Sequence, residues 1–208
     1  MNKKCRFCNE SLEVTFADLG TSPLSNSFLK KSSLTKEEPI YPLHVYVCKN
    51  CFLVQLEEFK SPEKIFNDYA YFSSYSQSWL DHAKKYTLKM TERFSLDEQS
   101  KGVEIASNDG YLLQYSKEKD VSVLGVEPAK NVAQVAIDAG IPTISKFFGV
   151  KTAEELVATH GRADLLLGNN VLAHVPDLND FVEGMKIMLA DQGVITMEFP
   201  HLDRKSVG

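Results

Sequence analysis

The second half of this 208-residue chain is constrained by a regular alternation of short apolar runs and amphipathic stretches. From residue 102 onward, the apolar runs have the length of strands and the stretches between them have the length of helices. Alternation at this spacing predicts an α/β fold with a mostly parallel, doubly wound sheet. The predicted strands are 102–107, 122–128, 142–145, 163–170 and 193–199, and the predicted helices are 111–119, 131–139, 152–159 and 177–189.

The first hundred residues follow a different pattern. Residues 1–60 lack helical periodicity and contain short apolar runs separated by turn formers, which predicts a small β-rich module. Residues 61–100 are predicted to be a linker and an amphipathic helix, with Ser78 and Asp81 as a capping pair at its start. The predicted apolar stripe of that helix is Trp79, Ala83, Tyr86, Met90 and Phe94. Residues 101–208 then form the Rossmann-like domain.

Composition excludes several classes of function. The net charge is −5 and there is no long basic run, so a nucleic-acid partner is disfavoured. No apolar run approaches the ~20 residues that a membrane-spanning helix needs. The N-terminal lysines are not followed by a hydrophobic signal region. We therefore expect a cytoplasmic protein with a small-molecule substrate, in a compartment where thiols stay reduced.

The four cysteines occur as two CxxC pairs, Cys5 with Cys8 and Cys48 with Cys51, and none is left over. Zn²⁺ accepts four thiolates tetrahedrally with no open position, which is the arrangement of a structural site. Complete pairing in a reducing compartment favours structural zinc. Two redox dithiols or buried free thiols are the alternatives.

The turn after the first predicted strand of the sheet, EIASNDGY at 104–111, is the main candidate for a ligand site. Ligands of doubly wound sheets bind outside the carboxyl ends of the strands. This turn lacks the GxGxxG that lets a backbone approach a pyrophosphate, because Ala106 and Ser107 stand in place of glycines and Asn108 is polar. It suits a ligand with an ammonium group and no phosphate, such as S-adenosylmethionine. Asp109 would accept from the ligand's α-amino group, and Gly110 would permit its close approach.

Polar or aromatic residues also follow the other strands. Glu127, which ends the second strand, can accept both ribose hydroxyls. Phe147 and Phe148 follow the third strand and could flank an adenine ring, while Asn169 and Asn170 end the fourth. The complete set of candidate cofactor residues is Glu104, Ser107, Asn108, Asp109, Gly110, Glu127, Pro128, Phe147, Phe148, Asn169 and Asn170. In the alternative interpretation Asp109 only caps a helix, Glu127 is solvated and the phenylalanines are core residues.

Several longer motifs resemble one family. They are CRFC, DLGTSPLSNSFL, YPLHVYVCKNCFLVQL, DYAYFSSYSQSWLDHA, EIASNDGYLLQ, GVEPAKNVA, NNVLAHVPDLNDF and EFPHL. Together they resemble the S-adenosylmethionine-dependent C-methyltransferases that carry an N-terminal zinc-binding domain. Many members act on nucleotide-linked deoxysugars, at the carbon next to a 4-keto group. The resemblance implies a class I methyltransferase core of Rossmann-like fold with these two cofactors.

The resemblance also implies which residues meet the substrate. A base must remove the proton beside the ketone, and the enolate oxygen needs stabilisation. Candidate catalytic residues are Tyr75, with Tyr71 as an alternative in the same stretch, His174 and His201. His44, His82 and His160 are interpreted as surface residues or residues of the zinc module. Family members continue past EFPHL into a Tyr-His-Glu-His stretch and a further domain, so we expect a truncated frame or a fragment.

Two other functions are compatible with the sequence. One is a catalytically silent module, in which the zinc domain recognises a partner and the Rossmann-like domain is a scaffold. The other is a nucleotide-dependent oxidoreductase on the same fold, which the missing GxGxxG counts against. Because a fold does not fix a function, the choice depends on the site itself.

Overall fold

The computed structural model describes residues 3–66 and 69–200. The chain divides into two compact units, Met1–Ala70 with Pro176–Asn179, and Tyr71–Val175 with Asp180–Gly208. The predicted linker and helix region, 61–100, contributes α1 (Pro62–Phe66) to the first unit and α2 (Gln77–Arg93) to the second. Among the described residues, no helix is long and apolar enough to cross a membrane.

The first unit is built on a three-stranded antiparallel sheet, as predicted for a β-rich module. Its strands lie in the order β1 (Val14–Ser22), β2 (Tyr41–Val47) and β3 (Val54–Leu56). A long excursion between β1 and β2 contains only the short 3₁₀ turn η1 (Lys31–Ser33). The buried core of this unit is small and centres on the cysteines, so little apolar burial is available to stabilise it.

The second unit is a five-stranded sheet in the order β6-β5-β4-β7-β8, and every neighbouring pair is parallel. This confirms the predicted doubly wound α/β fold. The strands are β4 (Lys101–Ile105), β5 (Ser122–Val126), β6 (Thr143–Ile144), β7 (Ala163–Asn169) and β8 (Leu189–Glu198). Chain order runs outward from β4 through β5 to β6 and then resumes at β7 on the other side of β4. The topological switch point therefore lies between β4 and β7.

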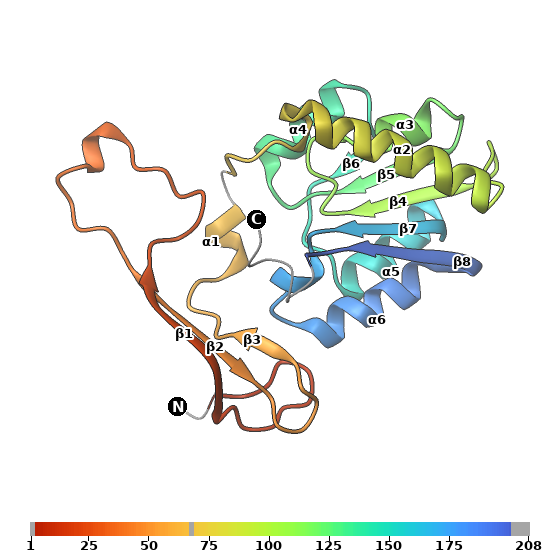
Figure 1. Ribbon diagram of the computed structural model, residues 1–208. Coiled ribbons are helices and arrows are strands. Elements are labelled where there is room, and N and C mark those ends of the chain that lie inside the picture. Colours follow the sequence, from red (N-terminus) through yellow and green to blue (C-terminus); the bar gives the residue numbers. More distant parts are fainter. Residues whose placement is uncertain (1–2, 67–68, 201–208) are drawn as a thin grey trace. The chain divides into compact units, whose positions relative to one another are not determined.

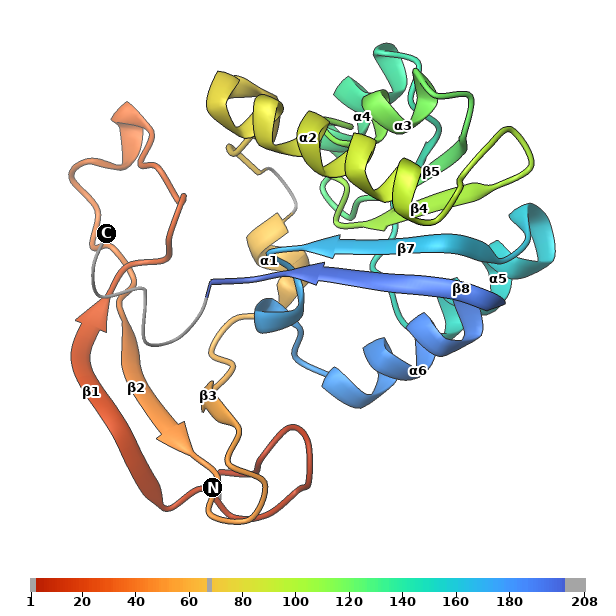
Figure 2. The ribbon, with the colours of Figure 1, turned by 45° about the vertical axis from the view of Figure 1, so that its right-hand side comes forward.

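Helices cover both faces of this sheet (Figure 1). One face carries α2, α3 (Leu113–Lys117) and α4 (Lys130–Asp138), and the other carries α5 (Val150–His160) and α6 (Leu178–Met188), as Figure 2 also shows. Side-chain alternation divides the core in the same way. Val103 and Ile105 of β4 pack towards α5 and α6, whereas Leu165 and Leu167 of β7 pack towards α2 and α3.

Helix α2 packs on the sheet through the predicted stripe. Ala83 and Met90 are buried in the core beneath it, and Trp79, Tyr86 and Phe94 pack against that core. The predicted cap is wrong. The helix begins one residue after Ser76, whose hydroxyl accepts from the Trp79 backbone N–H at 3.4 Å. A serine two residues earlier than expected is therefore the N-cap, because Ser78 already lies within the helix.

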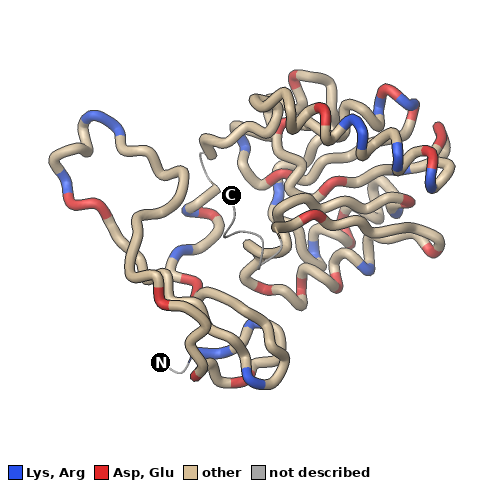
Figure 3. Tube along the Cα trace, in the orientation of Figure 1, with Lys and Arg blue, Asp and Glu red and all other residues tan. Residues whose placement is uncertain are grey.

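Charges of both signs are interspersed along both units, as Figure 3 shows.

The close approach of α5 and α6 leads to a first prediction. A Cβ added at Gly184 would lie 2.8 Å from the Gly149 carbonyl carbon and 2.9 Å from its oxygen. Since backbone atoms cannot move aside cheaply, we expect Gly184→Ala to lower the free energy of unfolding by about 1–3 kcal/mol. The only tryptophan, Trp79, lies in this unit, so its fluorescence during urea denaturation measures the effect.

The matched control is Gly102→Ala in β4. Its added Cβ would meet nothing closer than 3.9 Å. We expect its unfolding free energy to stay within about 0.5 kcal/mol of the parent, or to rise slightly because alanine loses less entropy than glycine on folding. Equal losses in the two variants would contradict the steric explanation.

Candidate functional site

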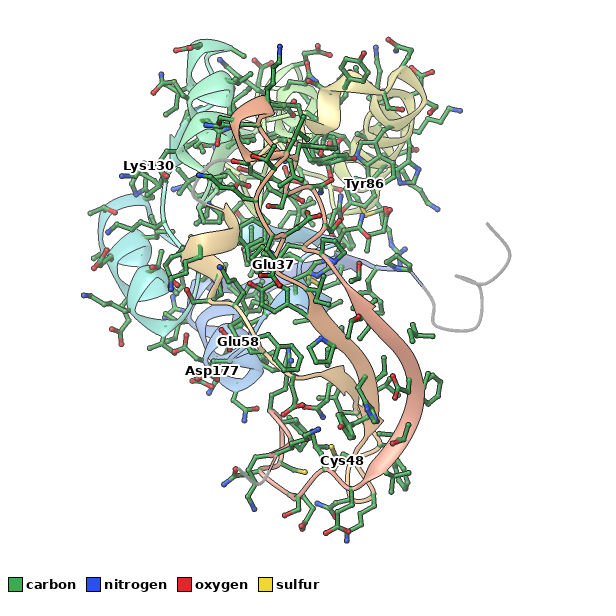
Figure 4. The ribbon with its side chains drawn as sticks, turned by 90° about the vertical axis from the view of Figure 1, so that its left-hand side faces the viewer. Glu37, Cys48, Glu58, Tyr86, Lys130 and Asp177 are labelled. Carbon is green, nitrogen blue, oxygen red and sulfur yellow. The ribbon has the colours of Figure 1, made fainter. Side chains whose placement is uncertain are left out.

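The four predicted metal ligands come together in the first unit. Their sulfur atoms all lie within 4.8 Å of one another. Contacts join the two CxxC pairs, with Cys5 Sγ 3.6 Å from Cys51 Sγ and Cys8 Sγ 3.5 Å from Cys48 Sγ. Four sulfurs about 2.3 Å from a tetrahedral Zn²⁺ would be about 3.8 Å apart, so the cluster fits that ion. Figure 4 shows Cys48 at one end of the small sheet.

Both CxxC segments adopt the same backbone turn. In the first, Cys5 O accepts from Asn9 N at 2.9 Å, and Cys5 N donates to Glu10 O at 2.8 Å. In the second, Cys48 O accepts from Phe52 N at 2.9 Å, and Cys48 N donates to Leu53 O at 3.0 Å. The residue after each second cysteine is left-handed, with φ 60° at Asn9 and 63° at Phe52. This repeated turn directs both sulfurs of each pair to one side.

The electrostatics of the cluster favour a cation. Burial opposes ionisation of Cys5, but hydrogen bonds from the Cys8 backbone and the Gln55 side chain outweigh it and lower the pKa of that thiol to about 6. Although the Leu53 amide favours a Cys51 thiolate, burial and the neighbouring sulfurs raise the pKa of Cys51 to about 12. Thiolates this close together repel one another, and a divalent cation would offset their charge.

Gln55 on β3 supports this cluster from outside it. The side chain is buried, its Nε2 donates to Cys5 Sγ at 3.2 Å, and its Oε1 accepts from Arg6 N at 3.0 Å. Sequence reasoning did not single out Gln55. Gln55 lies within the motif YPLHVYVCKNCFLVQL, but a glutamine four residues after Cys51 does not by itself indicate a contact with Cys5, so only the folded structure reveals it.

In the second unit, the turn after β4 has an unusual backbone. Ala106, Asn108 and Gly110 are all left-handed, with φ values of 56°, 51° and 80°. Positive φ at alternate residues is a conformation that glycine adopts most easily. The sequence placed the glycine substitutes at Ala106 and Ser107, but Ser107 is not among the left-handed residues. The turn therefore has the backbone of a glycine-rich loop although it contains one glycine.

The segment before α2 is hydrogen-bonded to this turn. Asn108 Oδ1 accepts from Ser73 N at 2.8 Å, and Asn108 Nδ2 donates to Tyr71 O at 3.2 Å. Asp109 Oδ2 accepts from both the backbone N–H and the hydroxyl of Ser74. Asp109 is 6% exposed, and its Oδ1 has no hydrogen-bond partner within the described part of the chain.

Glu127 connects two turns at the carboxyl ends of β4 and β5. Its Oε2 accepts from Asn108 N at 3.0 Å and its Oε1 accepts from Ala129 N at 2.8 Å. Burial raises the pKa of this carboxyl, while the hydrogen bonds from Ala129 and Asn108 act in the opposite direction. The alternative in which Glu127 is solvated is wrong, since only 4% of the residue is exposed.

Glu104 lies within β4, shortly before the turn that contains Asn108 and Asp109. It is fully buried on the face of β4 that α2 and α3 cover, and neither of its oxygens has a hydrogen-bond partner among residues 3–66 and 69–200. Burial raises the pKa of Glu104 well above its ordinary value; the nearby Tyr111 hydroxyl acts in the opposite direction, and the charges of Glu127 and Asp109 add to the rise. A neutral carboxylic acid at this point can both donate and accept a hydrogen bond.

The remaining cofactor candidates lie at the carboxyl ends of neighbouring strands. The two phenylalanines have different environments. Phe148 packs on Phe181 with ring centroids 5.4 Å apart, whereas Phe147 is 40% exposed. Asn169 Nδ2 donates to the Tyr111 hydroxyl at 3.1 Å. Asn170 N donates to Glu198 O, and the Pro128 carbonyl accepts from Ser145 Oγ at 3.3 Å.

The candidate catalytic residues are more exposed. Tyr75 is 96% exposed and ends the 3₁₀ turn η2 (Ser73–Tyr75), and Tyr71 is 48% exposed. His174 is exposed at the end of η3 (Leu172–His174), directly after β7. His201 lies outside the described residues. His82 is exposed, as predicted for a surface residue, and its Nε2 lies 2.9 Å from Glu198 Oε2 at the carboxyl end of β8. Both belong to the second unit.

Comparison with known proteins agrees with both parts of this description. Residues 5–66 match the family Methyltransf_13, described as "Putative zinc binding domain". C-methyltransferase NovU from Streptomyces niveus is 33% identical over 199 residues, which cover 96% of this chain and 47% of that protein. The chain thus spans about half the length of the curated relative. These findings confirm the resemblance that the motifs indicated.

The fold has a counterpart among solved structures. The crystal structure of a SAM-dependent methyltransferase from Archaeoglobus fulgidus superposes with a TM-score of 0.50 at 13% identity, covering 59% of this chain and 54% of that one. At this identity the similarity concerns the fold alone. It agrees with a Rossmann-like core of the methyltransferase type.

We expect the purified chain to hold one zinc ion, and Cys48→Ser to lose it. Since the core of the first unit centres on the four sulfurs, losing the metal should unfold this unit. Metal analysis measures the stoichiometry, and hydrogen exchange of the β2 amides measures the unfolding.

The matched control is Glu13→Gln, which removes an exposed acid of the same unit that pairs with Lys49. Its zinc content should equal that of the parent. Full zinc occupancy in Cys48→Ser, or zinc loss in Glu13→Gln, would refute the four-cysteine site.

Gln55→Met should weaken zinc binding about 10- to 100-fold, because it removes the donor to Cys5 Sγ at similar side-chain volume. Competition with a chromophoric chelator measures the affinity. An unchanged affinity would show that the hydrogen bond from Gln55 does not tune the cluster.

Proposed function

We propose that this chain is the zinc- and S-adenosylmethionine-binding part of a C-methyltransferase. Its acceptor would be a nucleotide-linked deoxysugar, methylated at the carbon adjacent to a ketone. Similarity to C-methyltransferase NovU supports the reaction class. The acceptor follows from the resemblance of motifs such as DYAYFSSYS and EIASNDGYLL.

One observation carries the cofactor assignment. Asp109 Oδ1 is a buried carboxylate oxygen with no partner in the described chain, at the topological switch point of a parallel sheet. A buried carboxylate oxygen without a hydrogen-bond partner is costly, and an ammonium group within reach would remove that cost. The α-amino group of S-adenosylmethionine is such a group. Glu104, whose two oxygens are also buried without a partner, adds a second polar group nearby.

The other candidates would hold the rest of the cofactor. Each Glu127 oxygen accepts one backbone N–H and keeps a further lone pair for a ribose hydroxyl. Phe147, which is 40% exposed, is the better candidate for the adenine ring, because Phe148 packs against the core. The remaining contacts would come from Ser107, Asn108, Gly110, Pro128, Asn169 and Asn170.

Bound S-adenosylmethionine supplies a methyl group on a positively charged sulfur. The chain's own contribution is orientation, exclusion of water and stabilisation of the enolate. Tyr75 O–H is a donor suited to the enolate oxygen, and the exposed imidazole of His174 is suited to bind the acceptor beside β7. His201 keeps the role that the resemblance gives it, a substrate contact after β8.

Zinc has a structural role in this proposal. Four cysteine ligands complete a tetrahedron and leave no position for water or substrate, unlike a catalytic zinc site. The metal would therefore stabilise the first unit without entering the reaction.

Calorimetric titration with S-adenosylhomocysteine tests the cofactor assignment. We expect the parent to bind, and Glu127→Ala and Asp109→Asn to bind at least about tenfold more weakly, since each loses a hydrogen bond to a charged group worth about 1.5–3 kcal/mol. Circular dichroism of each variant establishes that it is folded.

Asp138→Asn is the matched control, because this acid lies on α4, away from the proposed cofactor residues, and accepts a hydrogen bond from the Gln134 side chain. It should bind like the parent. A folded, zinc-loaded parent that does not bind S-adenosylhomocysteine would refute the cofactor assignment and favour the silent scaffold instead.

A further inference from the structure

A row of aromatic and polar side chains extends across the switch point from β4 to β8. The Trp79 ring stacks on Tyr111 with centroids 6.1 Å apart and 24° between the planes. It also stacks on His82, with centroids 5.1 Å apart and 20° between the planes. Tyr111 accepts from Asn169 at the end of β7, and His82 contacts Glu198 at the end of β8.

The end of this row at β7 and β8 lies on the opposite side of the switch point from Glu127 and the β5 turn. The proposed cofactor residues lie mostly after β4, β5 and β6, and Asn169 and Asn170 extend this set to the end of β7. A methyl acceptor must lie next to the cofactor, so the end of β8, where Glu198 lies, is the part of the carboxyl edge left for it. Tyr111, in the turn after β4, borders both parts.

Two contacts hold the His82 side chain in one orientation. Trp79 fixes the plane of the imidazole, and the Glu198 carboxylate fixes Nε2 as the protonated nitrogen. In the neutral imidazole Nδ1 is then the hydrogen-bond acceptor, and within the described residues it has no hydrogen-bond partner. The His82 side chain is 52% exposed and that of Glu198 is 38% exposed, so a ligand can reach the pair.

An ordinary surface ion pair would not need this construction. Exposed pairs contribute about 0–1 kcal/mol and commonly consist of flexible side chains. Here the partners are 116 residues apart in sequence and one of them is stacked on a half-buried tryptophan. Pre-organisation of an exposed acceptor nitrogen is a property of binding sites.

We propose that His82, oriented by Glu198 and Trp79, positions the methyl acceptor by accepting a hydrogen bond at Nδ1 from one of its hydroxyl groups. The inference rests on the proposed function and assigns its acceptor side to a residue outside the candidate catalytic set. Glu198 and Trp79 are positioning residues, because they act through the imidazole.

The test follows the imidazole nitrogens of His82 by ¹⁵N NMR, with the chain saturated by S-adenosylhomocysteine. The probe is a nucleoside diphosphate-linked 4-keto-deoxyhexose. We expect the free chain to show the Nε2–H tautomer at His82, Glu198→Gln to reduce its population, and the probe to shift Nδ1. In calorimetry, His82→Gln should weaken probe binding about three- to tenfold, the loss of about one hydrogen bond, without changing S-adenosylhomocysteine binding.

His160→Gln is the matched control, since His160 ends α5 and contacts Thr159. Failure of S-adenosylhomocysteine to bind would overturn the proposed function itself. Normal cofactor binding with no probe-induced shift at His82, including the case in which the probe does not bind, would overturn only this inference. So would equal probe affinity of parent and His82→Gln, which would leave the pair as a surface contact.

Discussion

The buried carboxylate of Glu127 joins the two turns on which the candidate site depends. One oxygen accepts from Asn108 in the turn after β4, and the other accepts from Ala129 in the turn after β5. Without this acceptor, two backbone N–H groups at adjacent strand ends would be buried and unsatisfied. Asn108, one of the left-handed residues of the β4 turn, is held by this contact, and its side chain in turn hydrogen-bonds to the segment before α2.

The same turn concentrates buried acids that the apolar core would otherwise exclude. Glu104, Asp109 and Glu127 are each at most 6% exposed, and the first two keep oxygens without partners among the described residues. Such groups destabilise a fold unless something outside the chain satisfies them. Their proximity is therefore better explained by a ligand than by stability, and a cationic ligand with hydroxyl groups meets the requirement.

The zinc unit obeys a separate constraint. Its core consists of the cysteines with Leu12, Tyr46 and Leu53, which is too little apolar surface to hold three strands by burial alone. Its stability therefore depends on the ion that four converging sulfurs would bind. The sheet unit has two extensive apolar clusters of its own and does not share this dependence.

Much of the fold and of the candidate site could be predicted from the sequence. Strand and helix lengths predicted the doubly wound sheet, and complete CxxC pairing predicted the sulfur cluster, because both patterns are local and periodic. The order of residues after each strand also indicated where Asp109, Glu127 and Asn169 would gather. The sequence did not reveal that Ala106 and Asn108 adopt glycine-like φ values, since the surrounding contacts impose that conformation.

Only the tertiary structure decided which distant residues meet. Alternation along β8 turns Thr196 and Glu198 towards α2, where they contact Tyr86 and His82. Helical periodicity places His82 near Trp79, but no local sequence pattern predicts which strand end lies opposite His82. The packing of α2 across β4, β7 and β8 places the end of β8 there. The sequence by itself determined the elements and the chemistry at their ends, and the pairing of those ends came from burying one apolar stripe on one face of the sheet.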